Sequence, residues 1–341
     1  MKAIILAGGE GTRLKSVTGD LPKPMVKLCG EPVLTHILRL LKKNGITDVC
    51  MALRYRPEVI RDHFGDGAAL GMRIAYRVDS AQRGTAGAVL SCRDFYGDRD
   101  FLVISGDCVC DFDLRALMEA HRRHQSAVTL ALYAQEQPLR YGVVLTDPSD
   151  RVVSFVEKPD WSRVVSDLVN TGIYVLSPRA MEYVPADRPF DFAKDLFPLL
   201  LAQGHELRGV RMDGYWCDVG TPRSYYQCCV DALDGRVRLE GVAPPEPEHP
   251  GYAARPDAGA RRVYACRSRA RLMRALSQSL MEAGADFSDG VALENAEGRV
   301  HISPDADREA LTISAQAADP SKSAALADGF LGLIRGLESG L

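Results

Sequence analysis

The stretch Leu6-Ala7-Gly8-Gly9-Glu10-Gly11-Thr12-Arg13-Leu14 decides the fold, and it follows a short apolar run at 2–5 that predicts a buried strand. Three glycines in four positions let the backbone approach a ligand closely, because no Cβ stands in the way. A glycine turn that opens a helix presents unpaired N–H groups, which suit phosphate oxygens. Arg13 can bind two phosphate oxygens at once, and Lys23 adds a compact positive charge. The stretch therefore predicts a triphosphate-binding loop.

Two common phosphate-binding motifs do not fit this stretch. Residues 8–13 lack the last glycine of the dinucleotide fingerprint G-x-G-x-x-G, and they lack the Gly-Lys-Ser/Thr of a Walker loop. The stretch instead resembles the signature L-A-G-G-x-G-T-R-L, followed by P-K, of the sugar-1-phosphate nucleotidyltransferases. This resemblance implies catalytic roles for Arg13 and Lys23. It also implies a nucleotide-binding loop made of Leu6, Ala7, Gly8, Gly9, Gly11, Thr12 and Arg13.

The composition excludes several other classes of protein. A length of 341 residues allows about two or three domains, and 46% hydrophobic with 26% charged residues is typical of a soluble globular protein. A net charge of −3 provides no basic field for nucleic acid. We expect no membrane partner and a cytoplasmic location, because no apolar run approaches the roughly 20 residues that span a bilayer and no leader precedes the first strand. The nine scattered cysteines are interpreted as free thiols.

The order of expected elements in the first two thirds of the chain is strand, helix, strand, helix. This alternation predicts a Rossmann-like α/β fold with a mixed, mostly parallel sheet flanked by helices. Ligands bind such sheets at the carboxyl ends of the strands, where the glycine loop lies. The elements expected after the glycine loop are a helix at 33–44, a strand at 48–53, a helix at 57–64, strands at 73–77 and 101–107, and a helix at 222–233.

A second glycine-containing segment, Gly84-Thr85-Ala86-Gly87, opens a further expected helix. The family often has E-x-x-x-L-G-T-A-G at this place, and the resemblance implies that Gly84 and Thr85 bind the nucleoside. This chain has Asp79 and Arg83 where glutamate and leucine are usual, so the preference for a base stays open.

Two aspartates at strand ends are the candidate metal ligands. Asp107 follows an apolar strand, and a carboxylate beside a phosphate loop is a hard oxygen ligand that suits Mg²⁺. The resemblance implies that Asp107 and Asp218, the latter in Trp216-Cys217-Asp218-Val219-Gly220, complete one magnesium site. Asp113 is expected to cap a helix. The histidines are interpreted as structural, with His36 packed on its helix and the basic run at 121–124 on an exposed helix end.

The sugar-phosphate site is expected on and after a β-hairpin with arms at 141–144 and 152–155. The family motif E-K-P stands here as Glu157-Lys158-Pro159, and the motif N-x-G-I-Y begins at Asn170. The resemblance implies that Lys158 pairs with the phosphate and has a catalytic role, whereas Glu157 binds sugar hydroxyls. The residues implied to face the sugar phosphate are Gly142, Glu157, Lys158, Asn170 and Gly172.

The domain organisation is expected to comprise a nucleotidyltransferase domain at 1–234, a proline-rich linker at 235–261 and a small α+β domain at 262–341. The sequence shows no hexapeptide period, so no left-handed β-helix is expected. The order β-α-β-β-β-α of the tail resembles the C-terminal domain of phosphohexomutases. The phosphate loop of those enzymes is replaced at 304–309 by a segment with two aspartates, so we expect no mutase chemistry and a role in packing, oligomerisation or regulation.

The resemblance implies nucleotidyl transfer from an NTP to a sugar 1-phosphate, with Mg²⁺ as the cofactor. GTP and mannose 1-phosphate are the favoured substrates by analogy, and UTP or dTTP with glucose 1-phosphate is the alternative. A non-catalytic protein that senses a nucleotide sugar is the alternative from another functional class. A homo-oligomer is possible in each case.

Overall fold

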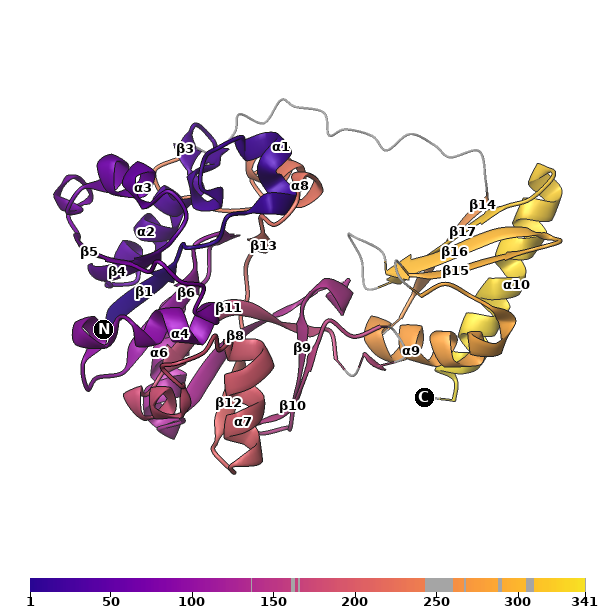
Figure 1. The fold of residues 1–341 in the computed structure, drawn as a ribbon. Helices are drawn as coiled ribbons and strands as arrows, with labels where there is room; N and C mark the ends of the chain where they lie inside the picture. The colour runs from indigo at the N-terminus through magenta and orange to yellow at the C-terminus, as the bar shows by residue number, and fades with distance from the viewer. Residues whose placement is uncertain are drawn as a thin grey trace. The chain divides into compact units, whose positions relative to one another are not determined.

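The computed structural model describes residues 1–135, 137–160, 163–164, 166–242, 260–266, 268–287, 290–304 and 310–340. The chain forms two compact units (Figure 1). The first unit comprises Met1–Tyr133, Thr146–Val153 and Asn170–Gly251, and the second comprises Ala134–Leu145, Ser154–Val169 and Tyr252–Leu341. Most of the expected linker, at 243–259, lies outside the described residues.

A nine-stranded sheet is the main feature of the described chain, and seven of its strands follow the order β10-β9-β11-β6-β1-β4-β5. β1 (Lys2–Leu6) pairs in parallel with β4 (Asp48–Leu53) and with β6 (Phe101–Ser105), whereas β11 (Leu168–Leu176) runs antiparallel to β6. The predicted mixed, mostly parallel sheet is therefore confirmed. The other strands are β5 (Arg73–Val78), β8 (Val128–Ala134), β9 (Gly142–Thr146), β10 (Val152–Glu157) and β12 (Leu207–Arg211).

The helices expected at 33–44, 57–64 and 222–233 are confirmed. Asp113 caps α6, as predicted, because its side chain accepts a hydrogen bond from the Arg115 N–H. None of the helices in the described residues is long and apolar enough to cross a membrane. The α-helices of this part of the chain are α1 (Lys15–Thr18), α2 (Val33–Lys43), α3 (Pro57–Phe64), α4 (Gly84–Leu90), α5 (Arg93–Tyr96), α6 (Leu114–His124), α7 (Phe197–Ala202) and α8 (Pro222–Leu233).

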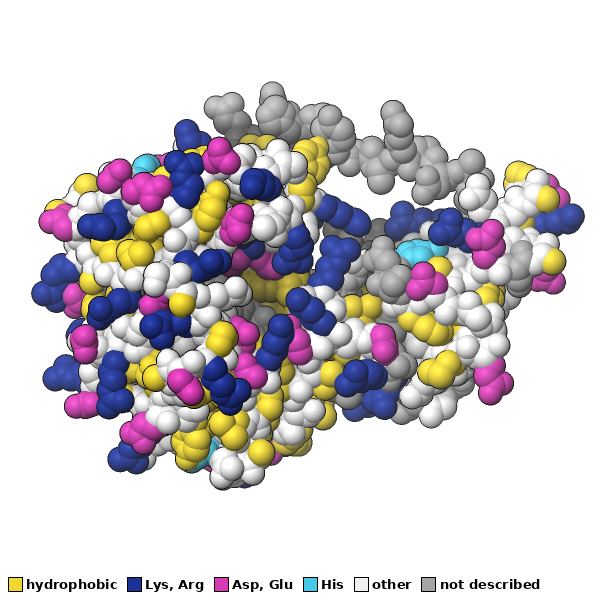
Figure 2. All heavy atoms as spheres, in the orientation of Figure 1, with side chains coloured by type: hydrophobic (Ala, Val, Ile, Leu, Met, Phe, Trp, Pro, Cys, Tyr) yellow, Lys and Arg dark blue, Asp and Glu magenta, His cyan; other side chains and the backbone are white. Residues whose placement is uncertain are grey.

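The central strands β1, β4 and β6 form the core of the first unit. Ile4, Ile5 and Val103 are fully buried, since parallel strands covered by helices are apolar on both faces. All nine cysteines are free, as the sequence predicted. Figure 2 shows basic and acidic side chains interspersed over the visible face of this unit, in accord with the small net charge. The core therefore holds the carboxyl ends of the strands in place beneath the glycine loop.

The prediction for His36 is confirmed, because this side chain is buried on α2. The prediction of an exposed basic run at 121–124 is wrong for His121, which is 1% exposed. The Nδ1 atom of His121 lies 2.9 Å from the Thr129 Oγ1 atom. The physical reason is the helical repeat, since Leu114, Leu117, Met118 and His121 share the buried stripe of α6.

The C-terminal part of the second unit is a four-stranded antiparallel sheet in the order β14-β17-β16-β15 (Figure 1). Helices α9 and α10 contact each other and pack on this sheet. The predicted order β-α-β-β-β-α is confirmed, whereas the loop at 305–309 lies outside the described residues. The elements are β14 (Ala260–Ala265), α9 (Arg269–Ser279), β15 (Val291–Asn295), β16 (Gly298–Pro304), β17 (Ala310–Gln316) and α10 (Pro320–Glu338).

Candidate active site

The glycine loop begins where β1 ends, and the Ala7 N–H donates to the Ala52 carbonyl at 3.0 Å. Gly11 has a φ of +68°, and a Cβ at this position would lie 2.7 Å from the Lys23 Cβ. Glycine is therefore required here both by the backbone conformation and by close packing against Lys23. The N–H groups of Gly8 and Gly9 form no hydrogen bond within the described part of the chain, so they are available to an anion.

The helical segment after this loop is shorter than a phosphate-binding helix. A 3-10 turn at Thr12–Leu14 leads into α1, which spans only Lys15–Thr18. A helix dipole of this length is weak, so the loop N–H groups and the exposed Arg13 side chain are the main groups that can attract phosphate.

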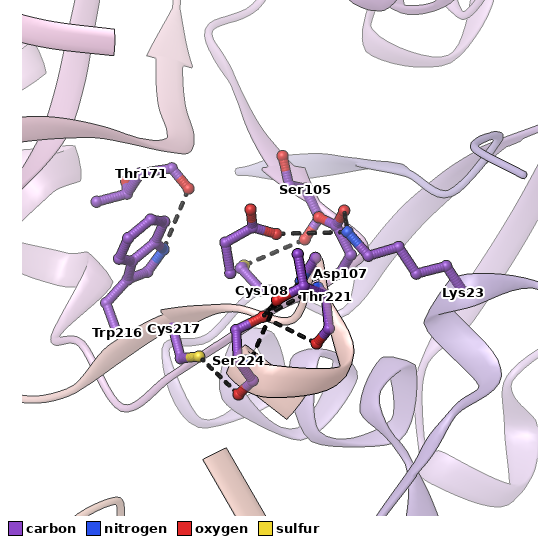
Figure 3. A network of polar contacts seen from close by, with 11 residues as sticks. Lys23, Ser105, Asp107, Cys108, Thr171, Trp216, Cys217, Thr221 and Ser224 are labelled. Atoms are coloured by element: carbon purple, nitrogen blue, oxygen red, sulfur yellow. Dashed lines mark hydrogen bonds and ion pairs between the residues drawn. The ribbon is translucent and has the colours of Figure 1, made fainter. Parts of the chain in front are cut away.

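The ammonium group of Lys23 lies between two carboxylates. Its Nζ atom forms an ion pair with Asp107 Oδ2, as Figure 3 shows. The same atom lies 3.4 Å from Asp218 Oδ1. Burial by itself lowers the pKa of Lys23, but the attraction of Asp107 and then of Asp218 outweighs it, so the pKa is raised. Lys23 therefore stays protonated although it is only 8% exposed.

A short antiparallel sheet brings the two aspartates together. Asp107 follows β6 and precedes β7 (Cys108–Cys110), which pairs with β13 (Trp216–Asp218) so that Asp218 lies opposite Cys108. The Val219 N–H donates to the Asp107 carbonyl at 3.0 Å. The sequence expectation that the sheet gathers these distant residues thus agrees with the geometry.

The electrostatic environment of Asp218 shows how charges are balanced at this point. Burial raises the pKa of Asp218, and the neighbouring charge of Asp107 raises it further, whereas Lys23 and Arg13 lower it. Arg13 therefore lies near enough to act on the Asp218 carboxylate. The two carboxylates converge on one positive group, the ammonium of Lys23. Such a pair fits Mg²⁺, because this ion is often held by one or two carboxylates together with water and substrate phosphate oxygens. The described residues contain no group of three or more metal-ligating side chains.

The second glycine loop is fixed by a carboxylate that the sequence analysis did not single out. Gly84 has a φ of +70°, and a Cβ there would lie 2.5 Å from the Phe190 carbonyl oxygen. The N–H and the hydroxyl group of Thr85 both donate to Asp191 Oδ1 at 3.0 Å. The Thr85 hydroxyl is therefore engaged with the protein, and so are the N–H groups of Ala86 and Gly87, which both donate to the Phe190 carbonyl.

The two departures from the family pattern pair with each other. The Arg83 Nε atom donates to Asp79 Oδ1 at 3.1 Å. The other oxygen of Asp79 accepts a hydrogen bond from the Ser91 hydroxyl at 2.9 Å. The charge of Arg83, which precedes α4, is thus balanced locally by the carboxylate of Asp79, which follows β5.

The N-x-G motif lies on β11 against the end of β6. The side chain of Asn170 accepts a hydrogen bond from the Gly172 N–H at 3.1 Å. Gly172 has a φ of +78°, and a Cβ there would lie 2.4 Å from the Ser105 Oγ atom. Since Ser105 ends the strand that leads to Asp107, Gly172 lies beside the strand end that carries the metal-ligand candidate.

The hairpin residues gather within the second unit. A Cβ at Gly142 would lie 2.6 Å from the Phe155 Cζ atom and 2.9 Å from Glu157 Oε2. Lys158 has a φ of +44°, a conformation that non-glycine residues rarely adopt, and its N–H donates to the Tyr141 carbonyl at 3.1 Å. Its exposed ammonium lies 3.9 Å from Glu157 Oε1. The strained backbone at a charged residue indicates a functional position.

A family described as nucleotidyl transferase matches residues 2–235. The chain belongs to the nucleotidyl transferase family. A UTP–glucose-1-phosphate uridylyltransferase from Synechocystis sp. is 32% identical over 269 residues, covering 75% of this chain and 68% of that protein. A mannose-1-phosphate guanylyltransferase from Mycobacterium tuberculosis is 35% identical over 260 residues, covering 75% and 72%.

A solved structure supports the same placement of the chain in the nucleotidyl transferase family. The crystal structure of HddC from Yersinia pseudotuberculosis complexed with GMP-PN has a TM-score of 0.59 and 31% sequence identity. The similarity covers 67% of this chain and 97% of that one. The predicted resemblance to sugar-1-phosphate nucleotidyltransferases is confirmed by the curated relatives.

Three supporting residues of this nucleotidyl transferase were missed by the sequence analysis. Asp191 holds Thr85, Ser105 faces Gly172, and the Gly106 N–H donates to the Leu6 carbonyl at 2.9 Å. Ser105 and Gly106 could have been found as the residues that end an apolar strand before Asp107. Asp191 carries no such signal, because its partner is distant in the sequence.

Proposed function

We propose that this protein transfers the nucleotidyl group of an NTP to a sugar 1-phosphate and releases pyrophosphate. The observation that carries this proposal is the ammonium of Lys23 between Asp107 and Asp218, beside a glycine loop at the carboxyl end of β1. The two relatives described above are named for transfer to glucose 1-phosphate and to mannose 1-phosphate.

The proposed reaction is an in-line displacement at the α-phosphorus. An oxygen of the sugar phosphate forms a bond to this phosphorus, and the bond to the bridging oxygen of the β-phosphate breaks. The leaving pyrophosphate takes the electron pair of that bond. A phosphate monoester has a second pKa near 6, so the nucleophile is largely dianionic at pH 7 and requires no general base. Catalysis then depends on positioning and on neutralisation of charge.

The side chains of this chain supply that positive charge. Arg13 and the free N–H groups of the glycine loop bind the β- and γ-phosphates, and Lys23 faces the α-phosphate. Lys158 pairs with the phosphate of the sugar, while Glu157 accepts hydrogen bonds from sugar hydroxyls. Fixed charges of this kind stabilise the transition state, because the protein groups are already in place and need not reorganise during the reaction.

Asp107 and Asp218 are proposed to hold Mg²⁺, since their oxygens already converge on one positive group, the ammonium of Lys23. When bound, the ion supplies charge neutralisation for the phosphate oxygens. Residues 1–234 carry the proposed reaction, and we propose no catalytic chemistry for 262–341.

GTP and mannose 1-phosphate are the proposed substrates. The guanylyltransferase from M. tuberculosis and the guanine nucleotide analogue in the HddC crystal support this choice. UTP or dTTP with glucose 1-phosphate is the alternative, which the Synechocystis relative favours.

The test measures pyrophosphate release for four NTPs combined with several sugar 1-phosphates, with Mg²⁺ and with EDTA. The expected result is release that depends on Mg²⁺ and is fastest for GTP with mannose 1-phosphate. A maximum for another pair would replace the proposed substrates and retain the reaction. Nucleotide binding without pyrophosphate release from any pair would overturn the reaction in favour of a sensor.

A further inference from the structure

The core of the second unit contains a residue from the segment that carries Lys158. Val164 is 1% exposed and belongs to the same buried cluster as Leu272, Ile302 and Ile334 of the C-terminal part. Leu139, which precedes β9, is partly buried and packs against this cluster as well. The segment 139–164 carries Glu157 and Lys158, and its two end residues, Leu139 and Val164, both pack into one core.

Leu139 and Val164 flank, in the sequence, three of the residues expected to face the sugar phosphate. Leu139 precedes Gly142, whereas Val164 follows Glu157 and Lys158. Between these two residues, the Lys158 N–H donates to the Tyr141 carbonyl at 3.1 Å. The segment is thus tied to itself at Lys158 and to the C-terminal core on either side.

This arrangement explains how the rare backbone conformation of Lys158 persists. A residue with a φ of +44° needs surroundings that hold it, because an extended or helical conformation is more favourable for lysine. A freely moving segment would relax toward those conformations. A segment that is anchored on both sides has fewer conformations to lose when a ligand binds.

We propose that Leu139 and Val164 are positioning residues, through which the C-terminal core holds Lys158 and Glu157 ready for the sugar 1-phosphate. This inference rests on the proposed function, since it assigns the C-terminal part to the same site. The C-terminal part then contributes to substrate affinity without any chemistry of its own.

Steady-state kinetics of the full chain tests this role. We expect Val164→Ala and the milder Leu139→Ala to raise KM for the sugar 1-phosphate about tenfold, because preorganisation is lost. The values of kcat and of KM for the NTP should change less than about twofold, since the NTP groups lie in the first unit. Val164→Ile should restore KM. The matched control is Val153→Ala on β10, because Val153 is 53% exposed.

A second measurement does not depend on activity. Hydrogen exchange of the Lys158 amide should be faster in Val164→Ala than in the wild type and unchanged in Val153→Ala. If no substrate pair releases pyrophosphate, the proposed function fails, whereas faster exchange still supports the anchor. If the wild type is active and neither KM nor exchange responds to Val164→Ala and Leu139→Ala, the anchor is refuted. A parallel loss of kcat and of affinity for both substrates also refutes it.

Discussion

Asp218 lies opposite Cys108 in the antiparallel pair of β7 and β13, and this register places its carboxylate beside that of Asp107. The far end of the pair is fixed by Asp111, whose carboxylate accepts hydrogen bonds from the Tyr215 N–H at 2.7 Å and the Arg238 N–H at 3.1 Å. The two proposed metal ligands therefore depend on a small sheet that is locked at both ends.

Removal of one carboxylate charge at this pair should abolish most of the activity. We expect Asp107→Asn and Asp218→Asn each to lower kcat on the order of 10² or more, because the site loses one of the two carboxylates proposed to hold Mg²⁺ while side-chain size is kept. Pyrophosphate release measures this effect. The control is Asp213→Asn, an exposed carboxylate on the approach to β13, which should leave kcat unchanged. Near-normal turnover in Asp107→Asn would contradict the metal assignment.

Lys23→Met should make the stability of the protein more dependent on Mg²⁺. Without the ammonium, two adjacent carboxylates that are about two-thirds buried repel each other. We expect a loss of about 1–3 kcal/mol in EDTA, less than for a fully buried pair. A divalent ion that binds only the folded state should recover more stability in this variant than in the wild type. Thermal unfolding with EDTA and with Mg²⁺ measures both effects, and equal Mg²⁺ responses would count against a shared cation site.

Gly172→Ala should destabilise the fold by more than the positive φ alone explains. The new Cβ would lie 2.4 Å from the Ser105 Oγ atom, in addition to a φ of +78°. Gly204 has the same φ, but a Cβ there meets nothing within 4 Å, so Gly204→Ala isolates the backbone effect. We expect a loss of about 1 kcal/mol for Gly204→Ala and clearly more for Gly172→Ala.

Urea unfolding of these two variants gives the difference in free energy. Ser105→Ala in the Gly172→Ala background should recover part of the loss, because it removes the atom in the clash. Equal losses for both glycine variants would show that contact with Ser105 does not matter.

The buried His36 should make stability fall at mildly acidic pH. Its Nε2–H donates to the Leu28 carbonyl at 2.9 Å, while Nδ1 has no hydrogen-bond partner among the described residues. Burial lowers the pKa of His36 below its ordinary value of 6.5. Below that value the unfolded chain binds more protons than the folded one, so stability present above pH 6.5 is lost as the pH falls toward the lower folded pKa.

Unfolding in urea at about pH 7.5 and about pH 5.5 tests this effect. His36→Gln, which has no titrating group but can still donate to Leu28, should show a smaller drop than the wild type. A residual drop is expected from His121, because burial lowers its pKa as well. An unchanged drop in His36→Gln would contradict the assignment.

Much of the fold was predictable because each element carries a local pattern. The apolar runs of β1, β4 and β6 and the helical repeat of α2 predicted their own structure. The order of elements in the C-terminal part was predictable for the same reason. The burial of His121 was not predicted, since a run of basic residues suggested an exposed surface although the helical repeat placed this residue on the inner stripe.

The sequence by itself determined the local chemistry of the site: a glycine loop with Arg13, a lysine between prolines, and carboxylates at strand ends. Only the tertiary structure decided that Asp107 meets Asp218, that Asp191 holds Thr85, and that Val164 enters the C-terminal core. The physical reason is that conformational preference and hydrophobic periodicity act over a few neighbouring residues. These three relationships instead depend on strand register and on packing between segments that are distant in the chain.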